Sequence, residues 1–406
     1  MLQRSIRGLL LLPAALLLAP AAVAQDTDWV VRADTVYTAA GDPIEGGGHV
    51  RVEDGKIVSV GSGRGRGADV LEAAAVTPGL IDLSVRIYTG NYSVEQSTEK
   101  PVTLSVGDTV DFYSYRWERE LASGVTTVLA SPEDRAVMGG YGVAIKTGGE
   151  PSLEARLVKE QAALRGSFGS EPSAGNRIPR GPRPTTFYFR RPTTRMGVEW
   201  VFRKSFYDAI ATERFPDRRT EETDVLMRVV RGELPFFVQA WATQDIRTAV
   251  YLKEEFGIPR MFVDAAAEAW REPALLVRSG MGVVLPPHRF QGRTTDGAFF
   301  AWDTAKMLHD RGVTFALSGH GSRDVADRLN RQPGYAMRGG LPMAAALAAV
   351  TINPARMVGI DDRVGSIEVG KDADLVLWSG TPFEPTSQII GVLLDGRLVV
   401  DPRSTE

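Results

Sequence analysis

The histidines of this chain are too few and too scattered to form a His-rich metal centre. The 406 residues include four His and no Cys, so any metal would need His, carboxylate or modified Lys ligands. No two His stand in a His-x-His or His-Glu-x-x-His spacing. His49 and His309 lie in a predicted sheet and on a predicted helix, which indicates packing or surface roles. Only His288 and His320 lie near the ends of predicted strands, where barrel and sheet proteins place their chemistry.

Apolar runs of strand length alternate with helical patterns through the middle of the chain. The predicted strands are residues 80–85, 126–129, 236–239, 261–264, 282–285 and 313–317, and helical patterns such as 244–256 and 298–309 follow several of them. This alternation predicts parallel βα units. The chain length favours a closed α/β barrel, and an open doubly wound sheet is the structural alternative.

Both ends of the chain carry short β-rich segments separated by turn signals. At the start these are residues 29–36 and 49–60, and at the end they are 373–378, 389–394 and 398–400. The shared character of the two ends predicts that their strands belong to one sheet.

The first residues predict export. Arg4 and Arg7 precede an apolar run at 9–18, and small residues follow up to Ala24. We expect cleavage near Ala24 and a periplasmic or secreted protein. A membrane anchor is the alternative, but the run is shorter than the roughly 20 residues that span a bilayer.

The charge pattern narrows the class of partner. Net charge is −3, and the chain has no long run of one sign, which argues against nucleic acid and against membrane contact after signal cleavage. Small molecules or another protein are the expected partners.

The Pro-rich segment 175–195, with six Arg and three adjacent aromatic residues, predicts a long loop, with a lid or protein-contact surface as its functional alternative.

Several ordered motifs resemble the amidohydrolase superfamily, most closely its imidazolonepropionase-like members. They are residues 76–82 (VTPGLID), 122–128, 139–146, 192–197, 353–356 (NPAR) and 364–376 (VGSIEVGKDADLV). The resemblance implies a (β/α)₈ TIM-like barrel with a small β-sandwich domain from both chain ends. On this basis we expect residues 25–77 and 357–406 to form the sandwich and 78–356 to form the barrel, after a signal peptide at 1–24 that the first residues predict.

The resemblance also implies zinc chemistry, in which a metal-bound hydroxide attacks an amide-type carbon while an Asp moves protons. Its ligands are a His-x-His pair on the first barrel strand, His on the fifth and usually the sixth, and the Asp is on the eighth. The first-strand positions of this chain hold Ser84 and Arg86. The fifth holds Gln239, the sixth offers only Asp264, and the eighth holds Gly319, or Ser318 or His320 after a one-residue shift.

Strand alternation predicts that Ser84 and Arg86 both face inward, where the ligands would be. A hydroxyl is a poor zinc ligand and a guanidinium has no lone pair to give. Arg86 would therefore place a fixed positive charge at the usual cation site. Lys146 could be proposed as a carboxylated bridging ligand, but it has no His partners, and the Gly-Gly-Tyr-Gly run near it predicts a tight loop.

We therefore expect a divergent member that lacks the metal ligands and has no metal cofactor where the family uses zinc. The first hypothesis is a pseudoenzyme, inactive or non-metal, that serves as a binding or partner subunit with an active amidohydrolase paralogue or with itself. The alternative is a hydrolase on non-peptide carbon–nitrogen bonds with a rebuilt site, and a third reading is a small-molecule binding protein. The pocket candidates are Ser84, Arg86, Gln239, Asp264, His288, Gly319 and His320.

Overall fold

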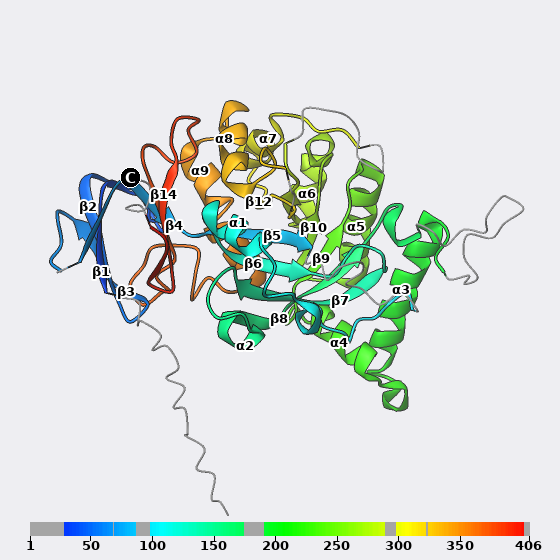
Figure 1. Cartoon of the computed structure of the whole chain (residues 1–406). Helices are drawn as coiled ribbons and strands as arrows, with labels where there is room; N and C mark the ends of the chain where they lie inside the picture. Colours follow the sequence, from blue (N-terminus) through cyan, green and yellow to red (C-terminus); the bar gives the residue numbers. More distant parts are fainter. Residues whose placement is uncertain are drawn as a thin grey trace, which may run out of the picture.

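Two β-sheets organise the molecule, one of seven strands and one of eight. A computed structural model describes residues 28–67, 69–86, 98–173, 191–288, 298–321 and 324–401. The predicted signal peptide and most of the segment 175–195 lie outside the described residues. Figure 1 shows the seven-stranded sheet beside the larger sheet, which carries most of the helices.

The seven-stranded sheet combines both ends of the chain, as the β-rich segments predict. Its order is β15-β14-β13-β4-β1-β2-β3, and antiparallel pairing of β13 with β4 joins the C-terminal strands to the N-terminal ones. Val31, Val50 and Leu375 belong to a core that this sheet has of its own. The strands are β1 (Trp29–Val36), β2 (Ile44–Glu53), β3 (Lys56–Ser62), β4 (Val70–Pro78), β13 (Leu375–Trp378), β14 (Ile389–Leu394) and β15 (Arg397–Val400).

The eight-stranded sheet confirms a mixed α/β fold with a barrel-like sheet. Its order is β12-β11-β10-β9-β8-β7-β6-β5. Strands β9, β10 and β11 occupy the predicted ranges, and their continuous apolar runs reflect burial on both faces. The strands are β5 (Leu80–Arg86), β6 (Val125–Ser131), β7 (Met138–Lys146), β8 (Leu157–Ser167), β9 (Phe236–Gln239), β10 (Met261–Asp264), β11 (Gly282–Leu285) and β12 (Phe315–Leu317).

Strand β7 corrects the expectation of parallel βα units throughout. It pairs antiparallel with both β6 and β8, because the connections on either side are too short for a crossover helix. The Gly-Gly-Tyr-Gly run that predicted a tight loop lies within this strand. Gly140 has a φ of +94°, and a Cβ there would lie 2.4 Å from the carbonyl oxygen of Leu104. The glycine thus permits a close backbone approach inside a sheet.

The edges of the eight-stranded sheet are joined by two consecutive residues of the chain. The backbone N–H of Leu317 in β12 donates to the carbonyl of Ala349, and that of Ile81 in β5 donates to the carbonyl of Val350. This bridge brings the ends of β5 and β12 to the same side of the molecule.

The two sheets are connected through Gly79, where β4 ends and β5 begins. A Cβ at this position would lie 2.1 Å from Oγ1 of Thr126. The peptide N–H groups of Gly79 and Leu80 donate to the carbonyls of Asp374 and Gly124. Only glycine fits this passage without displacing β6.

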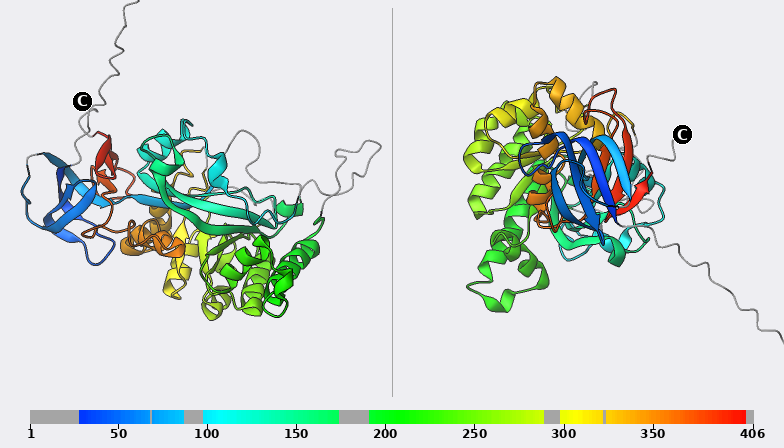
Figure 2. Two further views of the ribbon diagram at one scale, coloured as in Figure 1. Left: turned by 90° about the horizontal axis from the view of Figure 1, so that it is seen from below. Right: turned by 90° about the vertical axis from the view of Figure 1, so that its left-hand side faces the viewer.

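The helices pack against the outside of the barrel-like sheet, and those of the second half of the chain gather along one side of it (Figure 2). Phe202 of α3 stacks on Phe236 of β9, with ring centroids 5.7 Å apart. Helix α5 matches the predicted range 244–256, whereas α7 is shorter than the predicted 298–309. Within the described ranges, no helix combines the length and apolar character that crossing a bilayer requires. The helices are α1 (Arg116–Ala122), α2 (Leu153–Arg156), α3 (Arg195–Ala211), α4 (Glu221–Val230), α5 (Thr243–Phe256), α6 (Pro273–Ser279), α7 (Thr304–Asp310), α8 (Gln332–Arg338), α9 (Met343–Ala348) and α10 (Ile352–Val358).

Candidate functional site

Polar residues at the carboxyl ends of the barrel strands converge on one buried cluster. Ser84 and Arg86 end β5, Gln239 ends β9 and Asp264 ends β10. All four are buried, and Ser84 and Asp264 are 0% exposed. In α/β barrels this end of the strands carries the functional site. The sequence therefore places these four residues in the region where chemistry would take place.

The Arg86 guanidinium lies at the centre of this cluster. Its Nε and Nη2 donate to Oδ2 of Asp134 at 3.0 and 2.5 Å, and Nη2 also donates to Oδ2 of Asp264 at 3.1 Å. Its Nη1 donates to Oγ of Ser84 at 2.9 Å. Burial would lower the pKa of Arg86, but the two carboxylates outweigh burial and raise it. Arg86 is therefore a fixed cation held by two anions.

A second buried guanidinium, that of Arg165 on β8, lies against the same carboxylates. Its Nε donates to Oδ1 of Asp134 at 2.8 Å, and its Nη1 lies 2.6 Å from Oδ2 of Asp264. The sequence patterns identified neither Arg165 nor Asp134. The available signal was a single Arg inside the apolar run 162–168, because a buried cation requires an anionic partner.

Ser84 connects Asp264 to His320, which follows β12. Its hydroxyl donates to Oδ2 of Asp264 at 2.7 Å and lies 2.9 Å from Nδ1 of His320. A hydroxyl has one proton and two lone pairs, and Arg86 already donates to one lone pair. These bonds assign a proton to Nδ1 of His320, which leaves Nε2 as the acceptor of the ring.

The cluster is electrically balanced at neutral pH. Burial, followed by the charge of Arg86, lowers the pKa of His320 to about 4, so its ring is neutral. Burial would raise the pKa of Asp264, but Arg165 and Arg86 outweigh it and hold this pKa below its usual value. Two guanidinium cations thus face the carboxylates of Asp134 and Asp264.

Two non-glycine residues of this region, Ala265 and His320, adopt left-handed φ angles of 57° and 53°, a form of strain that often marks functional sites.

Gln239 extends the cluster toward β8. Its amide nitrogen donates to Oδ2 of Asp134 at 2.7 Å, and its amide oxygen accepts a hydrogen bond from Ser167 at 3.1 Å. The oxygen that could bind a cation is thus engaged by a hydroxyl.

Asp82 and Gly319 form a separate contact that ties β5 to the end of β12. Oδ1 of Asp82 accepts from the hydroxyl of Ser318 at 2.6 Å, and Oδ2 accepts from the N–H of Gly319 at 2.8 Å. A Cβ at position 319 would lie 2.9 Å from the backbone N of Leu329. The position where the resemblance implies a proton-transferring Asp therefore has no room for that side chain unless the backbone moves.

His288 does not join the cluster, which corrects its place among the pocket candidates. Its backbone N–H donates to Oε1 of Gln332 at 2.8 Å, and its ring packs near those of Trp302 and Tyr335. These contacts fix the segment after β11 and give the ring a packing role.

The cluster does not fit the His-rich zinc site that the resemblance implies. In the part of the chain that the structure describes, no group of three or more His, Asp or Glu is arranged to hold a metal ion. The carboxylates of Asp134 and Asp264 are already bound by guanidinium nitrogens, which have no lone pair to give. A cation placed between these carboxylates would have to displace Arg86 and Arg165.

Lys146 lies at the opposite end of the sheet, because β7 runs antiparallel to its neighbours. Its Nζ is 2.6 Å from Asp374, 3.0 Å from Asp395 and 3.1 Å from Asp372. This position excludes a bridging role at the cluster and gives Lys146 a role in binding the C-terminal segment to the barrel.

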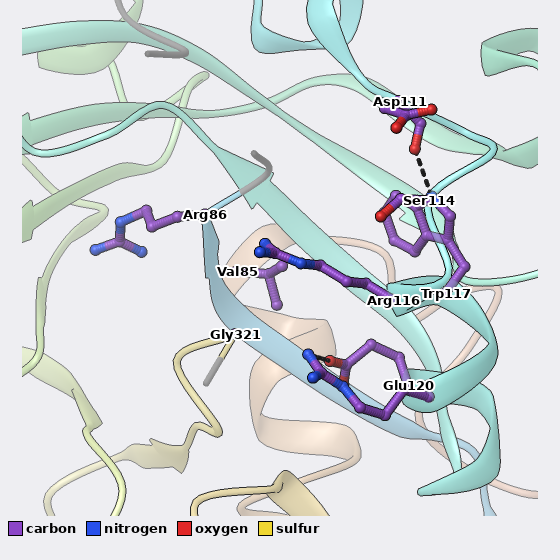
Figure 3. Close-up of a pocket in the computed structure, with 9 residues that line it drawn as sticks. Val85, Arg86, Asp111, Ser114, Arg116, Trp117, Glu120 and Gly321 are labelled. Atoms are coloured by element: carbon purple, nitrogen blue, oxygen red, sulfur yellow. Dashed lines mark hydrogen bonds and ion pairs between the residues drawn. The ribbon is translucent and has the colours of Figure 1, made fainter. Parts of the chain in front are cut away.

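The half-buried carboxyl of Glu120, on α1 (Figure 3), should make the stability of the protein depend on pH. Burial, and then the charge of Asp82, raises the pKa of Glu120 from 4.5 to about 7. A carboxyl whose pKa is raised on folding stabilises the fold below its unfolded pKa, and this contribution is lost as the pH rises through the folded pKa. Glu120→Gln cannot ionise at this position. The free energy of unfolding of the variant, relative to that of the wild type, should therefore increase by about 2 kcal/mol between pH 5 and pH 8. Urea unfolding at both pH values measures this, with Glu118→Gln at an exposed position of the same helix as the control.

These features define an α/β barrel-like protein with a charged cluster at the carboxyl ends of its strands. The amidohydrolase family profile matches residues 297–399. The amidohydrolase tasK of Hapsidospora irregularis is 28% identical over 236 residues, which is 52% of this chain and 24% of the relative. N-acetylglucosamine-6-phosphate deacetylase of Haemophilus influenzae is 42% identical over 57 residues, 14% of each protein. The chain thus spans at most 24% of the length of these curated relatives.

The fold comparison covers almost the whole chain. The crystal structure of an amidohydrolase from Thermotoga maritima MSB8 has a TM-score of 0.80 and 28% identity, over 91% of this chain and 99% of that one. The chain contains an amidohydrolase-family domain and has its structural neighbours in the amidohydrolase superfamily.

Proposed function

We propose that this amidohydrolase-family protein works without the catalytic zinc of its family, as an exported binding or partner subunit whose seven-stranded sheet forms the β-sandwich. The observation that supports this is the pairing of Arg86 and Arg165 with Asp134 and Asp264. The two guanidinium groups supply fixed positive charge where the family holds metal ions. They do not supply the coordinated water that a metal converts into a hydroxide near neutral pH.

Access and hydrogen bonding favour binding over hydrolysis. Ser84, whose hydroxyl contacts the ring of His320, is 0% exposed, and Arg86, Asp264 and His320 already use its hydrogen-bonding capacity. A fold can keep its framework after its chemistry is lost, because fold does not imply function. The proposed partners are an active amidohydrolase paralogue or a second copy of this chain, with a small molecule as ligand and without nucleic acid or membrane contact.

Metal content tests the proposal directly. The purified chain, incubated with excess Zn²⁺ and passed through a desalting column, should retain far less than one zinc per chain by inductively coupled plasma mass spectrometry. A zinc-dependent amidohydrolase taken through the same steps is the positive control. One tightly held zinc per chain, or turnover that a chelator abolishes, would contradict the proposal.

The alternative function is a hydrolase on non-peptide carbon–nitrogen bonds with a rebuilt site. The observation that favours it is the Asp264–Ser84–His320 relay, which leaves Nε2 of His320 as a proton acceptor on a left-handed residue. With a pKa of about 4 this ring is unprotonated at neutral pH but weakly basic, which limits its strength as a general base. Hydrolysis of cyclic or linear amides that survives chelation, and that Arg86→Ala or His320→Asn abolishes, would support this alternative.

A further inference from the structure

Helix α3 is apolar on two opposite sides. Its inner side packs into the core, where Phe202 and Phe206 are 0% exposed. Its outer side carries Met196, Trp200 and Tyr207, which are 82%, 50% and 55% exposed. These outer residues are four and seven positions apart, so they form one stripe along the helix, opposite the buried residues. A surface helix normally presents polar residues on this side, and packing within the chain therefore does not explain the stripe.

Helix α5 extends this stripe. Glu255 of α5 accepts hydrogen bonds from Nε of Arg203 at 2.9 Å and from the hydroxyl of Tyr207 at 2.8 Å, which holds the two helices side by side. Tyr251 lies one turn before Glu255 on the same side of α5 and is 52% exposed. In Figure 1 α3 lies at the end of the molecule away from the seven-stranded sheet. We define the outer face by four exposed side chains of the two helices, Met196, Trp200, Tyr207 and Tyr251.

The size of the outer face fits a modest contact between proteins. An aromatic side chain buries roughly 150–250 Å² when it is fully covered, so the exposed parts of the four residues sum to on the order of 400 Å². Trp200 remains half exposed although Arg191 lies over its ring, 5.6 Å from the ring centroid. An apolar patch of this size on a monomer is often functional. With a polar rim, it approaches the roughly 800 Å² per partner of a standard interface.

Charged residues of both signs surround the outer face. Arg203, Lys204 and Glu199 lie beside it on α3, and Glu255 lies beside it on α5. Such a surface does not select a strongly acidic or basic partner, but it can complement a copy of itself. If two α3 helices met in parallel, each residue would face its own copy, and Arg203 would face Arg203. If they met antiparallel, centred between Trp200 and Arg203, Glu199 would face Arg203 of the other copy.

We propose that the outer face binds the outer face of a second copy of this chain, with the two α3 helices antiparallel. This arrangement sets Met196 of each copy against Tyr207 of the other, and Trp200 against Lys204 of the other. A cation over an indole ring is a favourable contact. A two-fold axis repeats every contact, so each pair forms twice. The proposal rests on the proposed function, in which a second copy is one of the partners, and it assigns a surface to that partner.

Sedimentation velocity of the purified chain measures this association. Because the apolar area is small, we expect dimers to predominate at about 50 µM and single chains below about 1 µM. Trp200→Glu should weaken the association about thirtyfold or more, because it would bury a charge in an apolar contact. Tyr113→Glu, at an 84% exposed aromatic residue before α1, is the control and should associate like the wild type. Unfolding measured below about 1 µM compares single chains, so variants of Arg203 and Lys204 still serve as surface controls for stability.

Reversal of the charges tests the antiparallel arrangement. Glu199→Arg and Arg203→Glu each place like charges opposite one another, so each variant alone should associate about fivefold or more weakly than the wild type. An equal mixture of the two variants should form dimers again, because each charge then faces its opposite. Circular dichroism of the separate variants checks that both are folded.

Three results would each overturn the proposal. They are a chain that stays monomeric at about 100 µM, an unchanged dimer in Trp200→Glu, and a mixture that associates no better than the separate charge variants. A monomeric chain that retains no zinc would leave the proposed function intact, with an active paralogue as its partner. A dimeric chain that holds one zinc per copy would contradict the proposed function and leave this contact intact.

Discussion

Arg165→Met should destabilise the fold by about 3–5 kcal/mol at pH 7, because it leaves buried carboxylates without one of their two cations. Asp134 and Asp264 are each within 2.8 Å of an Arg165 nitrogen, and Arg165 is 2% exposed. Met replaces most of the volume of the side chain, so the loss reports on charge more than on a cavity. The midpoint of urea unfolding, followed by circular dichroism, measures the change.

Two further variants separate charge from packing at Arg165. The double variant Arg165→Met with Asp134→Asn removes one cation and one anion together, and should recover part of the lost stability because the balance of charge is restored. Arg203→Met removes an exposed cation paired with Glu255 and should cost no more than about 1 kcal/mol. If Arg165→Met cost as little as the surface variant, the charge of Arg165 would not be needed to stabilise the buried carboxylates of Asp134 and Asp264.

Lys146→Met should destabilise the protein by a similar amount, about 3–5 kcal/mol, at the opposite end of the barrel. The ammonium group contacts Asp372, Asp374 and Asp395, and the first two carboxylates are nearly inaccessible to solvent. Without Lys146 these anions repel each other in a buried setting. Burial raises the pKa of Asp374, so the loss should become smaller as the pH falls and Asp374 takes up a proton, which denaturant titrations at pH 7 and pH 4.5 would reveal.

The matched control for Lys146 is Lys204→Met, which removes an exposed Lys paired with Asp208 on α3. We expect a change of at most about 1 kcal/mol there. The double variant Lys146→Met with Asp374→Asn should be more stable than Lys146→Met alone, since one of the three repelling charges is gone. An additive or worse double variant would show that Lys146 acts through packing instead of charge.

The local pattern of apolar residues was sufficient to predict the strands that are buried on both faces. Residues 236–239, 261–264 and 282–285 are short apolar runs between turn signals, and they form β9, β10 and β11 with the predicted bounds. Strands β7 and β8 were missed because glycine and charged residues interrupt their apolar pattern. In β7, Gly140 lies against the backbone of Leu104 and Gly142 against that of Ala130, and in β8 Gly166 lies against the ring of Phe236. No local pattern reveals these contacts.

The sequence also located part of the site. Alternation along a strand fixes the face on which a side chain lies, and the carboxyl ends of parallel strands lie at the same end of a barrel. Ser84, Arg86, Gln239 and Asp264 lie at strand ends, and the structure brings them together with His320. His288 was placed among them because it also follows a strand. Its ring packs near Trp302 and Tyr335, a preference that depends on tertiary neighbours.

By itself, then, the sequence determined the barrel-like α/β framework, the sheet shared by both chain ends, and the presence of Arg86 where the family resemblance implies a metal ligand. Only the tertiary structure decided that Arg86 has a second guanidinium beside it, and that Asp134 and Asp264 face both. Arg165 and Asp134 are 31 positions apart in the chain, and Asp264 is 178 from Arg86. Partners so distant meet only when the sheet curves and its strand ends converge, because a buried charge is stabilised by whichever opposite charge the fold brings within a few ångströms.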